Sequence, residues 1–220
     1  MSLVRSVSEE TCEGKERILR EAERLFGQRG YQAVSIRELA QACGMTNAAL
    51  YYHFQDKEDI FYQMARRHFE RLADDLRDVL ARAGDDARAR LLALGQAYAA
   101  HLCRRQDTAH VFAEAMQKLG PERSQALQAC FRRHVLAVVV DALRAGQAAG
   151  QIRALDPVLA AEAFLNLLGV LRLHRADESR MPEIISQLVE YFLYGVMAEA
   201  VADARLSGQV DLAVRRGGEL

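Results

Sequence analysis

Along nearly the whole chain, apolar residues recur with the period of an α-helix, and no segment alternates as a half-buried strand would. The first apolar stripe has the spacing i, i+1, i+4, i+7, i+8, and Gly30 follows it as a helix-ending residue. It consists of Ile18, Leu19, Ala22, Leu25 and Phe26. Later stripes predict a long helix from Asp56 to near Gly84. They also predict further helices at roughly 86–105, 108–119, 121–149, 157–175 and 182–206.

The three prolines, Pro121, Pro157 and Pro182, each fall where one of these helices would begin. A proline is harmless in the first turn, where its missing amide hydrogen would have no helical partner. Asp156, just before Pro157, is a good N-cap residue. Short connections, no repeat and no strand pattern predict an all-α protein. Because the helices are short before about residue 55 and long after it, we expect an N-terminal domain over 8–55 and a larger helical domain over 56–210.

The stretch from Ser35 to Lys57 carries the most specific local pattern. Ser35 and Glu38 form a capping box at the start of one helix, and Gly44 ends that helix after about two turns. A second short helix, from Thr46 to about Phe54, follows directly. Two short helices joined by a tight turn predict a helix-turn-helix, whose second helix enters the DNA major groove.

At about 100° per residue, Leu50 and Thr46 fall on one side of this second helix. The other side spans an arc of about 140° and holds Asn47, Ala48, Tyr51 and Tyr52. Small side chains, phenolic donors and the absence of a carboxylate suit a groove lined with phosphates. The alternative is that both tyrosines pack on the long helices behind them, because helix-turn-helix geometry also occurs in proteins that bind no DNA.

Charge gives no independent support for DNA binding. The chain has 29 lysines and arginines against 30 aspartates and glutamates. Residues 1–60 hold two lysines and six arginines against ten carboxylates. Long-range steering is therefore weak, and any DNA affinity must come from a local group of residues.

The remaining composition signals indicate a cytoplasmic protein without a membrane partner. The four cysteines lie far apart, with no CxxC pair and no histidine at ligand spacing, so we expect neither a disulfide framework nor a metal site. The first ten residues lack the apolar core of a signal peptide, and no run of eighteen apolar residues exists.

Residues 14–57 resemble the N-terminal domain of the TetR family of bacterial repressors. The resemblance is carried, in order, by Arg24-Leu25-Phe26, Arg29-Gly30-Tyr31, Ser35-Ile36-Arg37-Glu38-Leu39-Ala40, Gly44-Met45-Thr46, Leu50-Tyr51-Tyr52-His53-Phe54 and Lys57. It covers about a fifth of the chain. The rest is similar only in its long helices.

This resemblance implies an operator-binding role for particular positions. Ser35 and Arg37 would contact phosphate; Thr46, Asn47, Ala48 and Ala49 would face the bases; and Tyr51, Tyr52, His53 and Lys57 would clamp phosphates. With alanine at both 48 and 49, base readout would depend on Asn47, Arg37 and methyl contacts. The helical wheel instead turns His53 toward the core, so a structural role for this histidine is also open.

We expect the larger domain to bind a small, largely apolar effector and to form the interface of a homodimer. Apolar, aromatic and a few polar residues are candidates for the effector site. They are Tyr98, His101, Leu102, Phe112, Met116, Phe131, His134, Phe164, Asn166 and Leu168. They could equally fill the core, and Asn166 could bond a backbone carbonyl instead of a ligand or a dimer partner. The dimer candidates come from a wide stripe on the last two long helices: Phe164, Leu171, Ile185, Leu188, Val189, Phe192 and Val196.

The function predicted is a repressor that binds an inverted-repeat operator as a dimer and is released by its effector. No catalytic motif is present, and no cofactor is expected. Two other classes are open to a helical chain: a small-molecule carrier or interaction protein, and an enzyme in a helical bundle. The absence of ExxH pairs argues against a carboxylate-metal enzyme. A carrier has no use for donors gathered on a carboxylate-free face.

Overall fold

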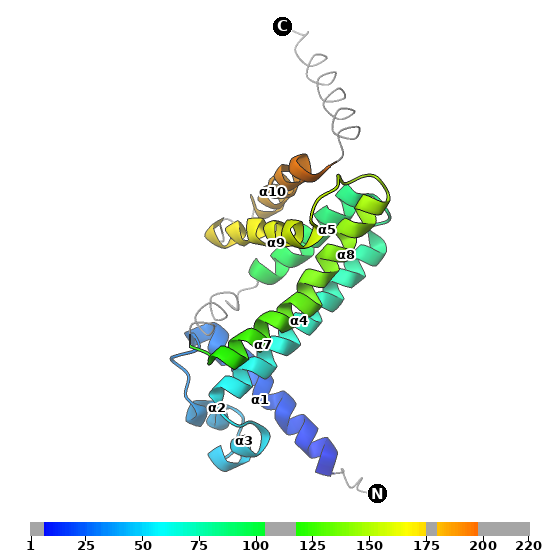
Figure 1. The fold of residues 1–220 in the computed structure, drawn as a ribbon. Coiled ribbons are helices and arrows are strands. Elements are labelled where there is room, and N and C mark those ends of the chain that lie inside the picture. The colour runs from blue at the N-terminus through cyan, green and yellow to red at the C-terminus, as the bar shows by residue number, and fades with distance from the viewer. Residues whose placement is uncertain (1–6, 104–117, 175–179, 198–220) are drawn as a thin grey trace, which may run out of the picture. The chain divides into compact units, whose positions relative to one another are not determined.

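The computed structural model describes residues 7–103, 118–174 and 180–197, and these are helical throughout apart from short connections (Figure 1). The α-helices are α1 (Val7–Arg29), α2 (Ile36–Ala42), α3 (Asn47–His53), α4 (Lys57–Arg82), α5 (Ala87–Cys103), α7 (Pro121–Phe131), α8 (Ala137–Ala148), α9 (Pro157–Leu168) and α10 (Met181–Val196). Within these ranges the β-type pairing seen is a single bridge between Ile152 and Met197. The all-α prediction is confirmed. None of the helices described is long and apolar enough to cross a membrane.

The helix ends follow the expected chemistry. Ser35 and Glu38 form the predicted capping box of α2. Asp156 caps α9 by accepting hydrogen bonds from the amides of Val158 and Leu159. Pro121, Pro157 and Pro182 all lie in the first turn of their helices.

Three long helices differ from the prediction. The helix expected over 121–149 is divided by a π-helical turn at Arg132–Leu136, which an apolar period alone cannot reveal. The helix expected over 157–175 tightens into a 3-10 segment at Gly169–His174. α10 stops at Val196, where Met197 becomes extended and Arg153 donates its amide hydrogen to the Val196 carbonyl. The segment expected over 108–119 lies almost wholly outside the described residues.

The chain divides into two compact units. The N-terminal unit contains residues up to Leu72 together with 104–134, and the C-terminal unit contains Ala73–Cys103 and the residues from Val135 onward. The boundary between the units therefore falls inside α4, and α7 belongs to the same unit as the helix-turn-helix.

The core of the N-terminal unit is built from the apolar faces of α1, α2, α3, the first half of α4 and α7. Phe26, Tyr31 and Phe61 form its aromatic centre, with ring centroids 5.3 to 6.2 Å apart. Leu39 and Leu50 are fully buried in the same cluster. The short helices are thus held by tertiary packing, because seven residues are too few for an isolated helix.

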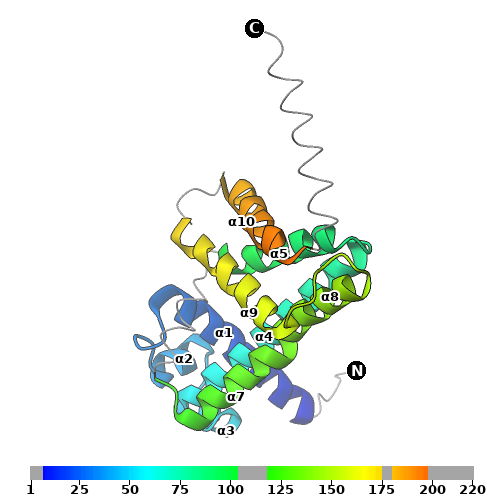
Figure 2. The ribbon, with the colours of Figure 1, turned by 45° about the horizontal axis from the view of Figure 1, so that its top comes forward.

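The C-terminal unit is a helical bundle in which α5 packs on α8 and α10, and α9 packs on α8 and α10. Figures 1 and 2 both show α9 beside α10. Phe164 and Phe192 meet edge to face at 5.0 Å. Gly95 lets α5 approach α10 closely, since a Cβ there would lie 2.8 Å from a methyl group of Val189.

Candidate nucleic-acid interface

The two helices of the helix-turn-helix are joined by Gly44, whose φ of 62° is a left-handed conformation that glycine adopts readily. Leu50 is completely buried and fastens α3 to the core, as the helical wheel indicated. Thr46 does not share the buried side with Leu50, contrary to the wheel. It is exposed, and its hydroxyl caps α3 by accepting the Ala49 amide hydrogen at 3.1 Å.

The outer face of α3 is open to solvent. Asn47 and Ala48 are exposed, and Ala49 is half-buried. Tyr51 and Tyr52 expose 53% and 73% of their surface, so neither ring is packed away against the long helices. This face carries no carboxylate from Asn47 to His53, and two adjacent exposed aromatic rings are a feature of interaction surfaces.

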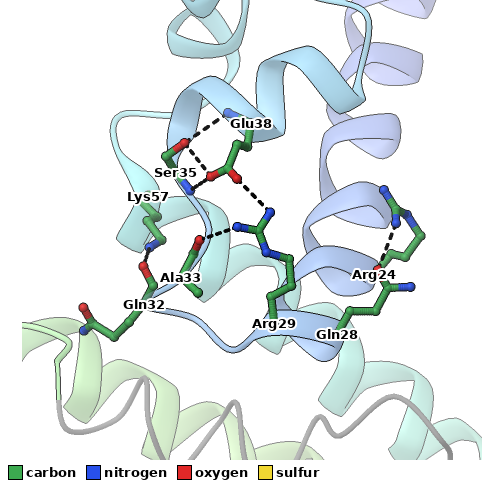
Figure 3. Close-up of polar contacts among 8 residues, drawn as sticks. All are labelled: Arg24, Gln28, Arg29, Gln32, Ala33, Ser35, Glu38 and Lys57. Atoms are coloured by element: carbon green, nitrogen blue, oxygen red, sulfur yellow. Dashed lines mark hydrogen bonds and ion pairs between the residues drawn. The ribbon is translucent and has the colours of Figure 1, made fainter.

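Arg37 is exposed on the first turn of α2, and no ion pair or hydrogen bond of its guanidinium is seen within the described part of the chain. Ser35, by contrast, is already engaged. Its amide and hydroxyl both donate to Glu38 Oε2 at 2.7 Å, and its oxygen accepts the Glu38 amide hydrogen at 3.2 Å (Figure 3). A phosphate contact by the Ser35 hydroxyl would compete with this capping box.

Arg29 completes this network from the end of α1. It donates to Glu38 Oε1 at 2.7 Å and to the Ala33 carbonyl at 2.9 Å, as Figure 3 shows. The hydrogen bonds from Ser35, followed by the contacts with Arg29, lower the pKa of Glu38 from 4.5 to about 2. The start of α2 is therefore fixed by an ionised, multiply bonded carboxylate.

Lys57 is turned toward the connection between α1 and α2. Its ammonium lies 4.3 Å from the ring centre of Tyr31. The ammonium also donates to the Gln32 carbonyl at 3.5 Å, a contact drawn in Figure 3. A cation over an aromatic face is a stabilising contact. The expected phosphate contact would therefore require the lysine to leave the Tyr31 ring.

His53 is half-buried at the end of α3, and its ring lies against Gly14 of α1. A Cβ at Gly14 would be 2.8 Å from His53 Nε2, closer than real contacts allow. Burial lowers the pKa of His53, and the nearby cations Lys15 and Arg17 lower it further, so the neutral ring is favoured at pH 7. The ring of Tyr52 meets that of His53 edge-on at 5.3 Å.

The effector candidates are divided between the two units. Tyr98, His101, Leu102, Phe164, Asn166 and Leu168 belong to the C-terminal unit, whereas Phe131 and His134 belong to the N-terminal unit. Phe112 and Met116 lie outside the described residues. His101 is buried, with its Nε2 2.7 Å from Asp75 Oδ2. Asn166 is exposed, and its side-chain amide donates to the Glu162 carbonyl at 2.8 Å. Of the partners considered for Asn166, the structure thus shows the backbone carbonyl.

The residues expected at the dimer contact are buried within the single chain. This is true of Phe164, Leu171, Ile185, Leu188, Val189, Phe192 and Val196. Among the residues whose burial the structure describes, the large apolar side chains left exposed on α9, the 3-10 segment and α10 are Val158, Leu159, Val170, Tyr191 and Tyr194. For α10 the sequence does indicate this exposed surface, because Tyr191 and Tyr194 lie one turn from each other on the side opposite the aliphatic stripe.

Comparison with known proteins identifies the family. Residues 18–64 match the model of the bacterial regulatory proteins of the tetR family, and residues 84–173 match the tetracyclin repressor-like C-terminal domain. The solved structure of PfmR, a TetR family transcriptional regulator from Thermus thermophilus, is 30% identical. It aligns over 81% of this chain and 97% of its own, with a TM-score of 0.66. The chain belongs to the TetR family.

The similarity to curated proteins covers less than a third of the chain. The HTH-type transcriptional repressor Rv1474c of Mycobacterium tuberculosis is 41% identical over 68 residues, 30% of this chain and 36% of the relative. The HTH-type transcriptional regulator AcrR of Shigella flexneri is 40% identical over 62 residues, 28% of this chain and 29% of the relative. The chain thus matches about a third of the length of these two regulators.

Proposed function

We propose that this protein is a DNA-binding transcriptional repressor that α3 directs to an operator and that a small, largely apolar effector releases. The observation that carries the proposal is the outer face of α3. It combines two exposed tyrosines, an exposed amide and no carboxylate on a helix anchored by the buried Leu50. Membership of the TetR family supports the same role.

The contacts follow from the chemistry of each side chain. Asn47 is suited to read a base edge, because an amide makes paired hydrogen bonds to adenine. Arg37 is suited to contact a phosphate and also a base edge, since a guanidinium makes paired hydrogen bonds to phosphate oxygens and to guanine. Tyr51 and Tyr52 would donate to phosphates, while Ala48 and Ala49 allow close approach. Thr46, Ser35, His53 and Lys57 all have partners within the protein, so their predicted DNA contacts would be secondary.

We further propose that residues 8–55 form the DNA-binding domain and residues 56–210 the effector and dimerisation domain. The exposed apolar residues of α9 and α10 are suited to bury against a second copy of the chain. A dimer would read an inverted repeat whose half-sites lie about 34–36 Å apart, or a multiple of that distance.

An effector held by the C-terminal helices would act through α4, which is continuous from Lys57 to Arg82. It would release DNA by binding better to a state in which the recognition helices are spaced unfavourably. A coupling free energy of about 1–3 kcal/mol corresponds to about 5–150-fold release.

The test is DNA binding by matched single-residue variants. An operator is first selected from random duplexes with the wild-type chain, and its affinity is then measured by fluorescence anisotropy at fixed salt. Asn47→Ala should weaken binding to the selected site by about 1–3 kcal/mol. It should weaken binding much less on a site already altered at the base pair that Asn47 contacts. Tyr51→Ala should weaken binding to all duplexes alike, because phosphates carry no sequence information.

Gln128→Ala, at an exposed position of α7, is the control and should bind like the wild-type chain. The proposal fails if random selection enriches no sequence. It also fails if the folded Asn47→Ala and Tyr51→Ala variants retain wild-type affinity and base preference.

A further inference from the structure

α7 belongs to the N-terminal unit, which contains the helix-turn-helix, although α7 lies far from α3 along the chain. Leu127 of α7 and the preceding Leu119 are buried in the same cluster as Leu39 and Leu50 of the helix-turn-helix. Phe131, at the end of α7, meets Phe69 of α4 edge-on at 5.3 Å. The position of α7 is thus coupled by packing to the helices that carry the DNA-binding face.

The polar contact between α7 and α4 is made by Arg123. Its Nη1 donates to Asp56 Oδ1 at 2.6 Å and to Glu58 Oε2 at 3.3 Å. The amide of Gly120, just before α7, also donates to Glu58 Oε2 at 3.3 Å. One guanidinium therefore joins two carboxylates of the α4 N-terminus, and 27% of its side chain remains exposed.

These carboxylates hold the connection between the recognition helix and α4. Asp56 accepts the Asp59 amide hydrogen at 2.7 Å and so caps α4, while Asp59 accepts the Gln55 amide hydrogen at 3.1 Å. Phe54, the C-cap residue of α3, is buried. Only residues 54–56 separate the two helices, so a displacement of the first turn of α4 passes directly to the end of α3.

The charge of Arg123 affects the pKa values of the groups beside it. Burial acts to raise the pKa of Asp56, but the hydrogen bonds from Arg123 and from the Asp59 amide outweigh burial and leave the pKa below its ordinary value. Beside them, burial, Glu58 and Asp56 raise the pKa of Tyr31 to about 12. Without Arg123, two neighbouring carboxylates would repel each other at the point where α3 joins α4.

We propose that Arg123 is a positioning residue for DNA recognition, which orients α3 by clamping the first turn of α4 to α7. This inference rests on the proposed DNA-binding function. Arg123 need not touch DNA. Its ion pairs hold the α3–α4 connection in place. Because they join α7 to the first turn of α4, a movement of α7 would also displace the recognition helix.

The experiment compares Arg123→Gln with Arg132→Gln, which removes the same charge from an exposed position for which no ion pair is seen among the described residues. Arg123→Gln should weaken operator binding by about two- to fivefold, the range typical of a partly exposed ion pair. Arg132→Gln should bind like the wild-type chain. Arg123→Lys, which restores one cation, should recover at least half of the lost affinity.

A second readout does not depend on DNA. The pKa of Asp56, followed by NMR, should rise in Arg123→Gln and stay unchanged in Arg132→Gln. If Asp56 titrates as in the wild-type chain, or if Arg123→Gln and Arg132→Gln weaken binding equally, the inference is wrong. It is also wrong if a smaller folded fraction of Arg123→Gln accounts for the whole loss of affinity. If the wild-type chain binds no DNA while the Asp56 shift is present, the proposed function fails and the clamp itself stands.

Discussion

Each unit of the molecule exposes a pair of tyrosines, and the two pairs differ in their surroundings. Tyr51 and Tyr52 on α3 are flanked by Asn47, Ala48 and the last-turn His53, all polar or small. Tyr191 and Tyr194 on α10 expose 65% and 61% of their surface, and the neighbouring α9 exposes aliphatic Val158 and Leu159. Exposure alone thus does not distinguish the two pairs. The other residues exposed on α3, and on α9 and α10, distinguish a surface suited to a polyanion from one suited to another apolar protein surface.

Introducing carboxylates at each pair in turn is the strongest test of this difference. Tyr191→Glu with Tyr194→Glu should raise the dimer dissociation constant by at least about a hundredfold, because carboxylates would be buried without partners. Light scattering should then find the single-chain mass of 24.6 kDa, whereas we expect twice that value for the wild-type chain.

Tyr51→Glu with Tyr52→Glu is the matched variant. It should leave the mass unchanged and remove DNA binding, since two carboxylates would face phosphates. If the α10 variant keeps the dimer, or if the α3 variant loses it, the two surfaces have been assigned wrongly.

A smaller effect, on the salt dependence of DNA binding, distinguishes Arg37 from Lys57 in the N-terminal unit. Arg37 is exposed, whereas the Lys57 ammonium lies on the Tyr31 ring. Arg37→Gln should reduce the slope of log affinity against log salt by about 0.9, the value for one phosphate contact. Lys57→Gln should leave that slope unchanged and weaken binding only through the position of α4. An equal fall in slope for both variants would show that Lys57 moves to a phosphate in the complex.

The smallest effect is the pH dependence of the α2 cap. The pKa of Glu38 is lowered from 4.5 to about 2 in the folded protein, so the carboxylate stabilises the fold fully above pH 4.5. This contribution should be lost as the pH falls from 4.5 toward about 2.

Urea unfolding of the wild-type chain and Glu38→Gln at several pH values measures it. The stability difference should be constant above about pH 5 and shrink at lower pH, because glutamine does not titrate. A difference that stays constant down to about pH 3 would contradict the assignment.

What the sequence predicted well is local. The capping box of Ser35 and Glu38, the buried Leu50 and the prolines at helix starts depend on residues within one or two turns, and the structure confirms them. Helical period also predicted that α9 and α10 carry broad apolar stripes.

The rest depends on contacts between distant segments. Period alone could not show that the stripe of α10 is satisfied within its own chain, which leaves Tyr191 and Tyr194 outside. Nor could it place Lys57 over the ring of the distant Tyr31, or join Arg123 to Asp56. The π-helical turn was equally hidden, because one additional residue per turn leaves the apolar composition unchanged.

At Gly14, intrinsic helix preference and side-chain packing oppose each other. In the interior of α1, alanine would favour the helix by about 1 kcal/mol over glycine. The same methyl group would occupy the space of the His53 ring at the end of the recognition helix. Alanine at position 14 would therefore bring its helix preference only if the His53 ring moved aside, and that ring belongs to the last turn of α3. Helix preference alone is thus a poor guide to substitution at this position.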